Sequence, residues 1–563
     1  MNEAVLIFTF SPIQPFISEA RRASDLYVGS HILVELAKAA ANSIRLRGTL
    51  IYPARISDDV PNKLVAIVPW DETEQIAENT KDSLLSGWKD IVSTARTEML
   101  KLNISVDKIW EEIWKRQTDS EYMWEVYWAA ASMESDSYED AYKKASYSLE
   151  AAKRNRIFEF AEEYGLKDSL SGKREALHTA EQNAKIYWDS ISEIPHITPS
   201  RLRPEGRERL DSIGAIKRFG KIDEKPNFFS TSTVAASDFL EKARPYLVDY
   251  RQRVEYLLGK YSYEVRKEDL DWPYDGDLLF LDTLTENRIE CSYGGVTRLD
   301  SLTAAQKALK KVYEKVQSHP SPYYAIIMLD GDGIGKQINE YLEQDNPVNA
   351  HREFSEKLAC FAEMAKSIVK PGFQIYNGGD DVLTLATLAE SISTAQTLAE
   401  YFRKITDGTA SAGIAIVHHL YPLDSALNAA RQAENDAKDV PGKAAVCVYA
   451  LKRGGQTLRV RSNWSSLEDN FDELVNLFKS DALASRFAYD VLQSAYTLPV
   501  ADEMFQAELK RLMMRHRNEK HPLAPDPQKW AARLNKWALQ LPENTDGLGR
   551  WLVLAHFVSQ GGE

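Results

Sequence analysis

Residues 1–130 contain short apolar runs separated by longer stretches in which apolar residues recur at helical spacing. The run Ala4–Phe10 stops at Ser11-Pro12, which predicts a buried strand that ends at a turn. The elements predicted after it are a helix over 14–45, a strand over 64–68, a helix over 73–101 and an alternating strand over 124–128. The order strand, helix, strands, helix, strand is that of a ferredoxin-like α+β unit.

The same order of elements returns in the second half of the chain. The apolar run 323–330 predicts a buried strand that ends in the carboxylate of Asp330. The elements predicted after it are a helix to about 369, strands over 373–376 and 382–386 around a tight turn, a helix over 391–404, a strand over 410–417, a helix over 424–438 and a strand over 444–449. Two blocks of one topology imply an internal duplication, although no sequence period repeats.

The rest of the chain is mostly helical in pattern. Residues 138–177 are rich in Ala, Glu, Lys and Arg, 272–277 form a turn-rich hinge between the blocks, and the chain beyond Lys452 lacks strand alternation. The predicted fold is α+β, with two ferredoxin-like domains, helical insertions and a C-terminal helical domain. The predicted domains span residues 1–135, 136–320, 321–452 and 453–563.

Composition fits a folded protein of several domains. The chain has 563 residues, 44% hydrophobic and 27% charged, and a length of about 150 residues per domain gives roughly four domains. The net charge of −14 argues against a protein that coats nucleic acid through bulk charge. The segment 510–536 is locally basic, with eight Lys and Arg residues against Glu519 and Asp526. By itself this segment is a solvated helix face, and it gains interest only with a nucleic-acid partner.

The sequence predicts a cytoplasmic protein without a membrane partner. No apolar run approaches the roughly 20 residues that span a bilayer, and the N-terminus lacks a basic start and a long apolar region. Three distant cysteines exclude a disulfide framework and a Cys-x-x-Cys zinc pair, so Cys291, Cys360 and Cys447 are predicted to be small core residues. His418 and His419 are adjacent on a strand and should point to opposite faces, which favours a structural role over a shared metal.

Three carboxylates are the strongest candidates for chemistry. The first and third strands of a ferredoxin-like sheet are neighbours, so Asp330 should lie beside the hairpin tip that carries Asp380 and Asp381. Converging carboxylates repel one another unless cations are present. Hard oxygen ligands suit Mg²⁺ or Mn²⁺, and two such ions about 3.5–4 Å apart would activate a 3′-hydroxyl and neutralise a leaving pyrophosphate.

The glycines before these carboxylates would allow a sharp turn and the approach of a triphosphate, because Gly378 and Gly379 have no β-carbon. Gly378-Gly379-Asp380-Asp381 alone is ordinary turn composition, and Asp330-Gly331-Asp332 alone is compatible with a helix cap. The pair is more specific, because the topology brings both motifs to one place.

Further polar residues around this place have two interpretations each. Asp332 is an extra ligand or the cap of the following helix. Lys438 and Lys443 reach phosphate oxygens or are exposed lysines near a helix end. Ser411 meets the edge of a nucleotide or bonds to the backbone.

These motifs, in this order, resemble the large polymerase–cyclase subunit of type III CRISPR effector complexes in its Cmr (III-B) form. The matching stretches cover most of the chain. They are residues 11–17, 20–22 and 25–30, 61–63, 124–128, 216–218, 229–232, Asp330-Gly331-Asp332, Gly378-Gly379-Asp380-Asp381, Ser411-Ala412-Gly413 and His418-His419 with Pro422-Leu423.

The resemblance implies two palm domains that hold ATP between them. The second palm would bind metal and catalyse through Asp330, Asp380 and Asp381, while the first would bind another nucleotide around Ser11 and Gln14 without catalysing. The remaining nucleotide-binding residues implied are Gly331, Asp332, Gly378, Gly379, Ser411 and Lys438. Binding of target RNA to the guide-loaded complex would switch on synthesis of cyclic oligoadenylate messengers from ATP.

The partners implied are the guide RNA, the target RNA, a Cas5-like subunit and the small helical subunits of the complex. The basic segment 510–536 would then lie near target RNA.

The sequence departs from the family pattern at two places. It starts directly at the first palm, so we expect no N-terminal HD nuclease, and 198–218 contain no cysteine, so we expect no zinc. The product is then open to variation, including an adenylate joined to another small molecule. A stand-alone diguanylate-cyclase-like enzyme acting on GTP and a degenerate scaffold are the alternatives, although a scaffold has no reason to retain three repelling carboxylates.

Overall fold

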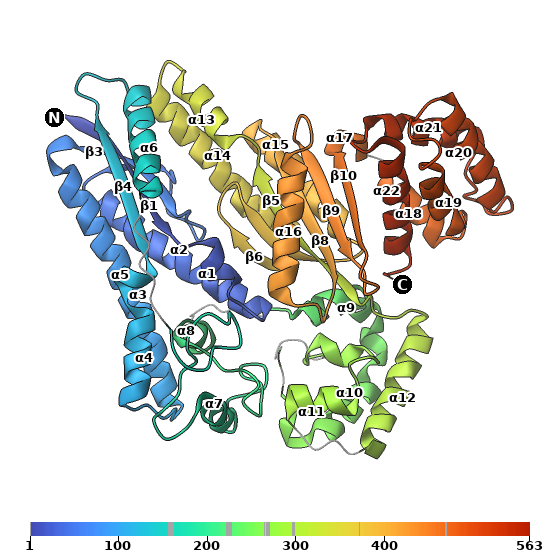
Figure 1. Cartoon of the computed structure of the whole chain (residues 1–563), viewed down its shortest axis with the longest axis horizontal. Helices are drawn as coiled ribbons and strands as arrows, with labels where there is room; N and C mark the ends of the chain where they lie inside the picture. Colours follow the sequence, from blue (N-terminus) through green and yellow to red (C-terminus); the bar gives the residue numbers. More distant parts are fainter. Residues whose placement is uncertain are drawn as a thin grey trace.

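The computed structural model describes residues 2–155, 163–220, 228–263, 265, 271–294, 299–370, 372–467 and 470–562. Two β-sheets stand next to each other, the first near the N-terminus and the second in the centre of the view (Figure 1). Helical segments lie beneath both sheets, and a cluster of C-terminal helices flanks the second sheet (Figure 1).

The first sheet has the strand order β2-β3-β1-β4, which is the ferredoxin-like order predicted from the sequence. Its strands are β1 (Glu3–Ser11), β2 (Thr49–Tyr52), β3 (Lys63–Pro69) and β4 (Glu125–Ser132). The central strand β1 is buried on both faces because alternate residues point to opposite sides. Leu6 and Phe8 pack in the large core with the helices α2 (Ala23–Arg45) and α3 (Thr73–Lys101), whereas Val5 and Ile7 pack against α6 (Tyr138–Arg154).

The helix predicted over 14–45 is two helices, α1 (Gln14–Ser18) and α2. The carboxylate of Asp25 accepts hydrogen bonds from the backbone N–H groups of Arg21 and Arg22, both at 3.1 Å, and so fixes the start of α2. The ammonium of Lys217 donates to the carbonyls of Phe16 and Glu19, at 2.5 and 2.8 Å. These side-chain contacts satisfy backbone groups that a continuous helix would have paired internally.

The second sheet repeats the first and extends it. Its strands are β5 (Tyr323–Gly331), β6 (Gln374–Asn377), β7 (Val382–Thr387), β8 (Ala410–His418), β9 (Ala445–Leu451) and β10 (Thr457–Asn463). The part β8-β5-β7-β6 of the order has the connectivity of β4-β1-β3-β2, which confirms two ferredoxin-like units. The helices of this unit are α13 (Ile334–Leu342), α14 (Pro347–Ile368), α15 (Ser391–Thr406) and α16 (Leu423–Lys438).

Strand β10 overturns the prediction that the chain is purely helical beyond Lys452. Val460 and Ser462 face the interior, while Arg459 and Arg461 form ion pairs with Asp436 at 2.6 Å and with Glu543 at 2.5 Å. The inward positions are too few and too polar to give a clear apolar alternation in the sequence.

The other helices form the middle and C-terminal parts of the chain. Those of the middle are α4 (Lys108–Thr118), α5 (Ser120–Met123), α7 (Ala184–Ser192), α8 (Ser212–Phe219), α9 (Thr231–Ala243), α10 (Val248–Leu258), α11 (Glu286–Tyr293) and α12 (Leu299–Val316). Short 3₁₀ helices are η1 (Trp70–Glu72), η2 (Arg244–Tyr246), η3 (Gly259–Tyr261) and η4 (Gly276–Leu279). Those of the C-terminal cluster are α17 (Trp464–Leu467), α18 (Phe471–Lys479), α19 (Arg486–Ser494), α20 (Glu503–His516), α21 (Pro527–Gln540) and α22 (Asn544–Ser559).

The helical prediction over 138–177 is confirmed only for α6. Residues 163–177 form bends and irregular backbone with an isolated antiparallel bridge between Lys167 and Glu175, and 156–162 lie outside the described residues. No helix in the described ranges is long and apolar enough to cross a membrane.

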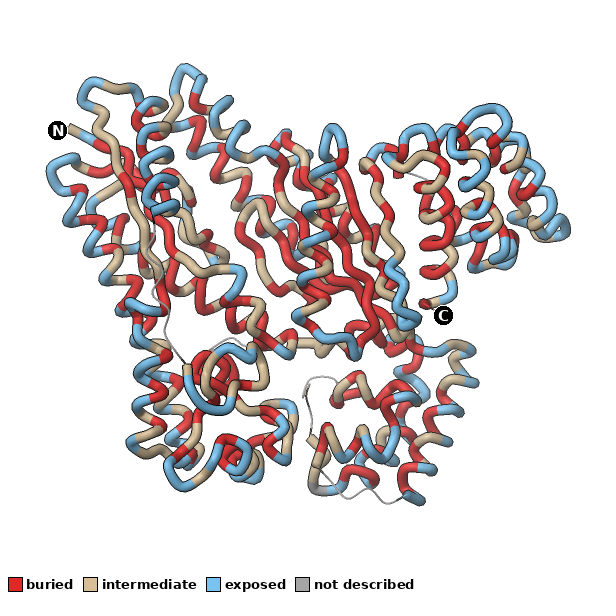
Figure 2. The backbone as a smooth tube through the Cα atoms, in the orientation of Figure 1, coloured by how far each residue is buried: buried red, intermediate tan, exposed pale blue. Residues whose placement is uncertain are grey.

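The two ferredoxin-like units contact each other directly. The backbone N–H of Ala54 donates to Ser355 Oγ at 2.7 Å, and the hydroxyl of Tyr138 lies 3.0 Å from Nδ1 of His351. Both partners belong to α14, and both contacts are buried. The central strands β1, β5, β7 and β8 are buried along almost their whole length (Figure 2). The two units therefore share an interface fixed by polar contacts in a dry environment.

Candidate functional site

The strand register brings the three acidic residues together. Leu329 of β5 pairs with Val382 of β7, so the next residues outward, Asp330 and Asp381, stand side by side. Burial and, after it, the charge of Asp330 raise the pKa of Asp380 to about 6. Burial also raises the pKa of Asp381 well above its usual value, helped by a hydrogen bond with Asp330 and by the charge of Asp380. The predicted repulsion between these carboxyl groups is therefore present.

A lysine of the second unit lies against this acidic group. The Nζ atom of Lys438 lies 2.5 Å from Oδ2 of Asp330 and 2.6 Å from Oε1 of Glu434. Burial lowers the pKa of Lys438, but its hydrogen bonds with these two acids raise it above the usual value. Lys438 therefore stands where the sequence predicts a cation that binds phosphate. In this structure its charge instead neutralises the carboxylates of Asp330 and Glu434.

The three carboxylates are not arranged around one point, as the ligands of a preformed metal site would be. Within the described ranges, no three His, Cys, Asp or Glu side chains are arranged to hold a metal ion. The chemistry of the donors still fits a hard divalent cation, because Asp330 stands beside Asp380 and Asp381, whose pKa values are raised, and adjacent carboxyl groups need positive charge. Metal ligation by Asp330, Asp380 and Asp381 stays a prediction.

The turn before Asp380 requires its two glycines. Gly379 has a φ of +98°, a conformation that residues with a β-carbon rarely adopt. A β-carbon on Gly378 would lie 2.0 Å from the hydroxyl oxygen of Tyr376. The glycines therefore let the turn close over Tyr376 and present both acids at the end of the sheet.

Asp332 and Ser411 are committed to contacts within the protein. The buried carboxylate of Asp332 accepts hydrogen bonds from Thr409 Oγ1 at 2.9 Å, Ser411 Oγ at 2.8 Å and the backbone N–H of Ala444 at 2.9 Å. The interpretation of Asp332 as a helix cap is wrong, because Gly333 caps α13 and no side chain takes part. Gly331 is also enclosed, since a β-carbon there would lie 2.7 Å from Ile334 and Phe402. Nucleotide binding by these residues stays a prediction.

A cavity of about 240 Å³ adjoins the acidic group and is lined by both units. Asp330 and Asp381 contribute to it from the second unit, and Gln14 reaches it from α1 of the first. Gln14 Oε1 accepts a hydrogen bond from Nη2 of Arg431 at 2.9 Å. Ser11 instead donates to Glu125 Oε2 at 3.0 Å within its own sheet. The structure therefore brings Gln14 to the predicted site and gives Ser11 a partner elsewhere.

Sequence reasoning missed four polar residues that line this cavity, namely Tyr376, Arg431, Glu434 and Asn435. Arg431 and Asn435 share one face of α16 with Lys438, at positions i, i+4 and i+7. This spacing was the available signal for them.

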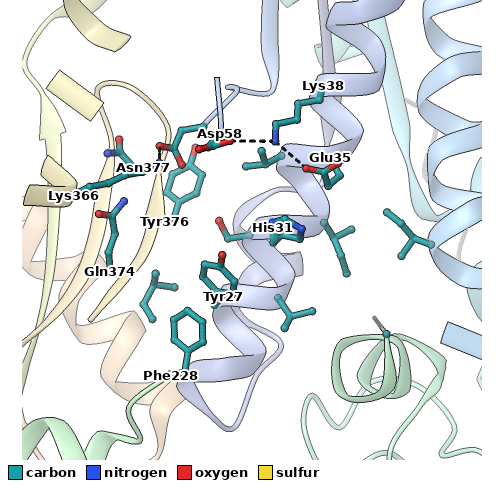
Figure 3. Close-up of a pocket in the computed structure, with 18 of the residues that line it drawn as sticks. Tyr27, His31, Glu35, Lys38, Asp58, Phe228, Lys366, Gln374, Tyr376 and Asn377 are labelled. Atoms are coloured by element: carbon teal, nitrogen blue, oxygen red, sulfur yellow. Dashed lines mark hydrogen bonds and ion pairs between the residues drawn. The ribbon is translucent and has the colours of Figure 1, made fainter. Parts of the chain in front are cut away.

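A larger cavity of about 980 Å³ lies on the other side of Tyr376, between α2 and β6 (Figure 3). Its aromatic lining includes Tyr27 and Phe228, whose ring centroids are 4.1 Å apart. Its lysines are already paired, since Lys38 lies 3.0 Å from Glu35 (Figure 3) and Lys366 lies 2.7 Å from Asp59. This cavity therefore offers aromatic surface but little uncompensated positive charge.

The two histidines differ from the prediction in orientation but not in role. Strand β8 ends at His418, so the ring of His419 does not turn to the opposite face, and the two ring centroids lie only 4.6 Å apart. His419 Nδ1 lies 2.8 Å from Ser232 Oγ, and its ring stacks on Phe280 at 4.2 Å. Both contacts are structural.

The cysteines and the basic segment show mixed outcomes. Cys447 is buried as predicted and Cys291 partly so, whereas Cys360 is exposed on α14, where helix amphipathicity places it outside.

In the basic segment, Arg511 pairs with Glu508 at 2.7 Å and Arg533 with Glu473 at 2.6 Å, so part of its charge is compensated within the chain.

Comparison with known proteins decides the family. Residues 323–447 match the family described as Cas10/Cmr2, second palm domain, and residues 5–58 match the CRISPR-associated protein Cmr2, N-terminal family. The chain is also 27% identical over 611 aligned positions to the CRISPR system Cmr subunit Cmr2 of Pyrococcus furiosus, covering 89% of this chain and 68% of that protein. The second ferredoxin-like unit thus matches the Cas10/Cmr2 second palm domain, and most of the chain is similar to Cmr2.

Further relatives and solved structures are similar to this chain. It is 24% identical over 242 residues to the Cas10/Csm1 single-strand-specific deoxyribonuclease (subtype III-A) of Mycobacterium tuberculosis, covering 38% of this chain and 29% of that protein. Its fold is similar to solved type III-B Cmr-β structures, in the apo state (TM-score 0.65) and bound to cognate target RNA (TM-score 0.69). Both are 12% identical and cover 100% and 99% of this chain, and 82% and 83% of those chains. The second ferredoxin-like unit is the part of the chain that matches the palm-domain family, and the solved structures share the overall fold.

Proposed function

We propose that this Cas10/Cmr2 chain is the large subunit of an RNA-guided type III-B antiviral effector complex and acts in the cytoplasm. On binding of target RNA, its palm domains would convert ATP into a cyclic oligoadenylate-type messenger. The observation that carries this proposal is the shared cavity, where Asp330 and Asp381 of the second palm face Gln14 of the first. Two palms that contribute to one cavity suit a reaction that joins two nucleotides.

The predicted site residues would have separate roles in nucleotidyl transfer. Asp330, Asp380 and Asp381 would hold Mg²⁺ or Mn²⁺, which when bound supplies Lewis-acid chemistry at the phosphate oxygens. The 3′-hydroxyl oxygen of one ATP forms a bond to the α-phosphorus of the next, the bond to the β-phosphate breaks, and pyrophosphate leaves while the hydroxyl proton passes to solvent. Lys438 would exchange its carboxylate partners for phosphate oxygens, and the non-catalytic first palm would orient the other nucleotide through Gln14.

The partners of this function are those of an effector complex. The guide RNA and the target RNA would lie along the assembly, with a Cas5-like subunit and the small helical subunits as neighbours. The solved complex with a similar fold contains cognate target RNA, which supports this assignment. The C-terminal basic segment 510–536 is the proposed surface nearest to target RNA.

Product analysis tests the proposal directly. The assembled complex is incubated with Mg²⁺, with ATP or GTP, and with matched or mismatched target RNA, and the products are weighed by mass spectrometry. We expect adenylate products from ATP with matched RNA only. Guanylate products from the purified chain without RNA would favour a stand-alone diguanylate-cyclase-like enzyme, a mass that combines adenylate with another molecule would favour the mixed messenger, and no product under any condition would leave a scaffold.

A further inference from the structure

Arg431 carries a charge that its protein surroundings compensate only in part. The residue is half-buried on α16, and its guanidinium donates to two neutral amide oxygens, Gln14 Oε1 at 2.9 Å and Asn428 Oδ1 at 3.4 Å. Among the residues whose positions are described, no carboxylate lies within 4.0 Å of this guanidinium. Burial lowers the pKa of Arg431, and the charge of Glu434, which lines the same cavity, offsets only part of this effect. A partly desolvated cation without an ion-pair partner is costly unless an anion joins it.

Other cations near the palm interface differ from Arg431 in pairing or position. Lys438 already contacts Asp330 and Glu434, and the lysines of the larger cavity are paired with acids (Figure 3). Lys63 of the first palm acts on the charge of Asp380 but does not line the smaller cavity. Among the described residues that line this cavity, Arg431 is the cation without an ion-pair partner, so it can bind an anionic ligand.

The position of Arg431 indicates which part of a ligand it would meet. In the proposed function, the transferred phosphate lies at the end of α16 that carries Lys438, next to the three acids. Arg431 is seven residues earlier on the same face of α16, about 10 Å away along the helix axis at 1.5 Å per residue. It also contacts Gln14 of the first palm, which is the side assigned to the nucleotide that supplies the 3′-hydroxyl.

We propose that Arg431 binds the 5′-phosphate groups of the acceptor nucleotide, the one whose 3′-hydroxyl attacks, and that Gln14 holds the guanidinium in place. The planar guanidinium suits two phosphate oxygens at once. This inference rests on the proposed function and names a residue of its acceptor site.

Acceptors with and without phosphates test the assignment. In the RNA-activated complex, 3′-deoxy-ATP acts only as donor, because it has no 3′-hydroxyl, and either ATP or adenosine serves as acceptor. Donor and acceptor join with loss of pyrophosphate, and mass spectrometry quantifies the dinucleotide that ends in 3′-deoxyadenosine. We expect Arg431→Ala to lower kcat/KM for the ATP acceptor by about tenfold or more, the effect of losing one hydrogen bond to a charged group, and to leave the adenosine acceptor unchanged.

Controls separate binding from architecture. Arg403→Ala, at an exposed arginine of α15 in the same palm, should change neither acceptor, and Arg431→Lys should retain part of the preference for ATP. If Arg431→Ala does not assemble, Arg431→Gln takes its place. An equal loss with both acceptors would mean that Arg431 only joins the palms, and an unchanged preference would remove it from the site; either result overturns the inference while the proposed function stands. A wild-type complex that joins neither acceptor would overturn both.

Discussion

The Nζ atom of Lys438 lies 2.5 Å from Oδ2 of Asp330, and it shares its charge with Glu434 at 2.6 Å. The chain thus supplies one cation of its own to an acidic group that also contains Asp380 and Asp381. A divalent ion carried in with a nucleotide would take over this compensation and release the lysine toward the phosphates.

Replacing Lys438 should make the second palm depend more strongly on divalent ions. We expect Lys438→Met to lower the thermal unfolding midpoint in chelator, because Asp330 loses a charged hydrogen bond worth about 1.5–3 kcal/mol. Mg²⁺ should then raise the midpoint more in the variant than in the wild type. Calorimetry with and without Mg²⁺ measures both effects. The matched control is Lys336→Met, since Lys336 forms an exposed pair with Glu340 at 3.4 Å and should change little. Equal responses of the two variants would contradict the account.

The close approach of Gly378 to Tyr376 allows a prediction that combines two substitutions. Gly378→Ala places a methyl group 2.0 Å from the tyrosine hydroxyl oxygen and should destabilise the second palm by about 1–3 kcal/mol. Tyr376→Phe removes that oxygen, so the double variant should recover part of the loss. Thermal unfolding of the two single variants and the double variant forms the cycle. Additive effects would show that the hydroxyl is not the obstacle.

Asp332 should act through stability rather than through the ligand. Asp332→Asn replaces an acceptor of three hydrogen bonds by a group that cannot accept all of them, and we expect a loss of about 1–3 kcal/mol. Ser411→Ala removes one donor of the same set and should cost less. ATP affinity of the folded complexes, measured by titration calorimetry, should stay close to the wild type for both. A large loss of affinity with unchanged stability would instead support the predicted role of Asp332 in nucleotide binding.

The buried ion network between α2 and α8 should make the first palm sensitive to acid. Burial alone would raise the pKa values of Asp25 and Glu208, but the charge and hydrogen bonds of Arg218 hold both below their usual range. A lowered carboxyl pKa contributes stability that is present above the usual value of about 4 and is lost as pH falls through the lowered one. The unfolding midpoint of the wild type should therefore drop steeply below about pH 4.

Removing the arginine reverses the sign of this dependence. Arg218→Met leaves the buried carboxylate of Asp25 without an ion pair and Glu208 with Arg22 alone, which costs about 3–5 kcal/mol at neutral pH, and acidification should then restore stability by protonating Asp25. Arg511→Met, at an exposed pair on α20, should follow the wild-type pH profile. A wild-type-like profile for Arg218→Met would refute the role assigned to the network.

Features set within one domain were predictable, and features set between domains were not. The proximity of Asp330 to Asp381 follows from strand order, because a ferredoxin-like topology makes the first and third strands neighbours. The contact between Gln14 and Arg431 joins residues 417 positions apart across two palms, and no local pattern encodes how two domains pack.

Local patterns also failed where a distant side chain decides the backbone. The break between α1 and α2 depends on Lys217, about 200 residues away, which binds the carbonyl groups at the end of α1. The position of Lys438 on its helix predicted a cation near the acids, but not that Asp330 would already hold it. The charge balance of a pocket becomes visible only when all of its members are placed.

The central claim is that the carboxylates at the end of the second palm sheet carry out nucleotidyl transfer. The most direct measurement compares wild type with the double variant Asp380→Ala and Asp381→Ala in the assembled complex, supplied with ATP, Mg²⁺ and matched target RNA. The account predicts that product is lost while complex assembly and RNA binding are retained. Unchanged turnover in the double variant would contradict it.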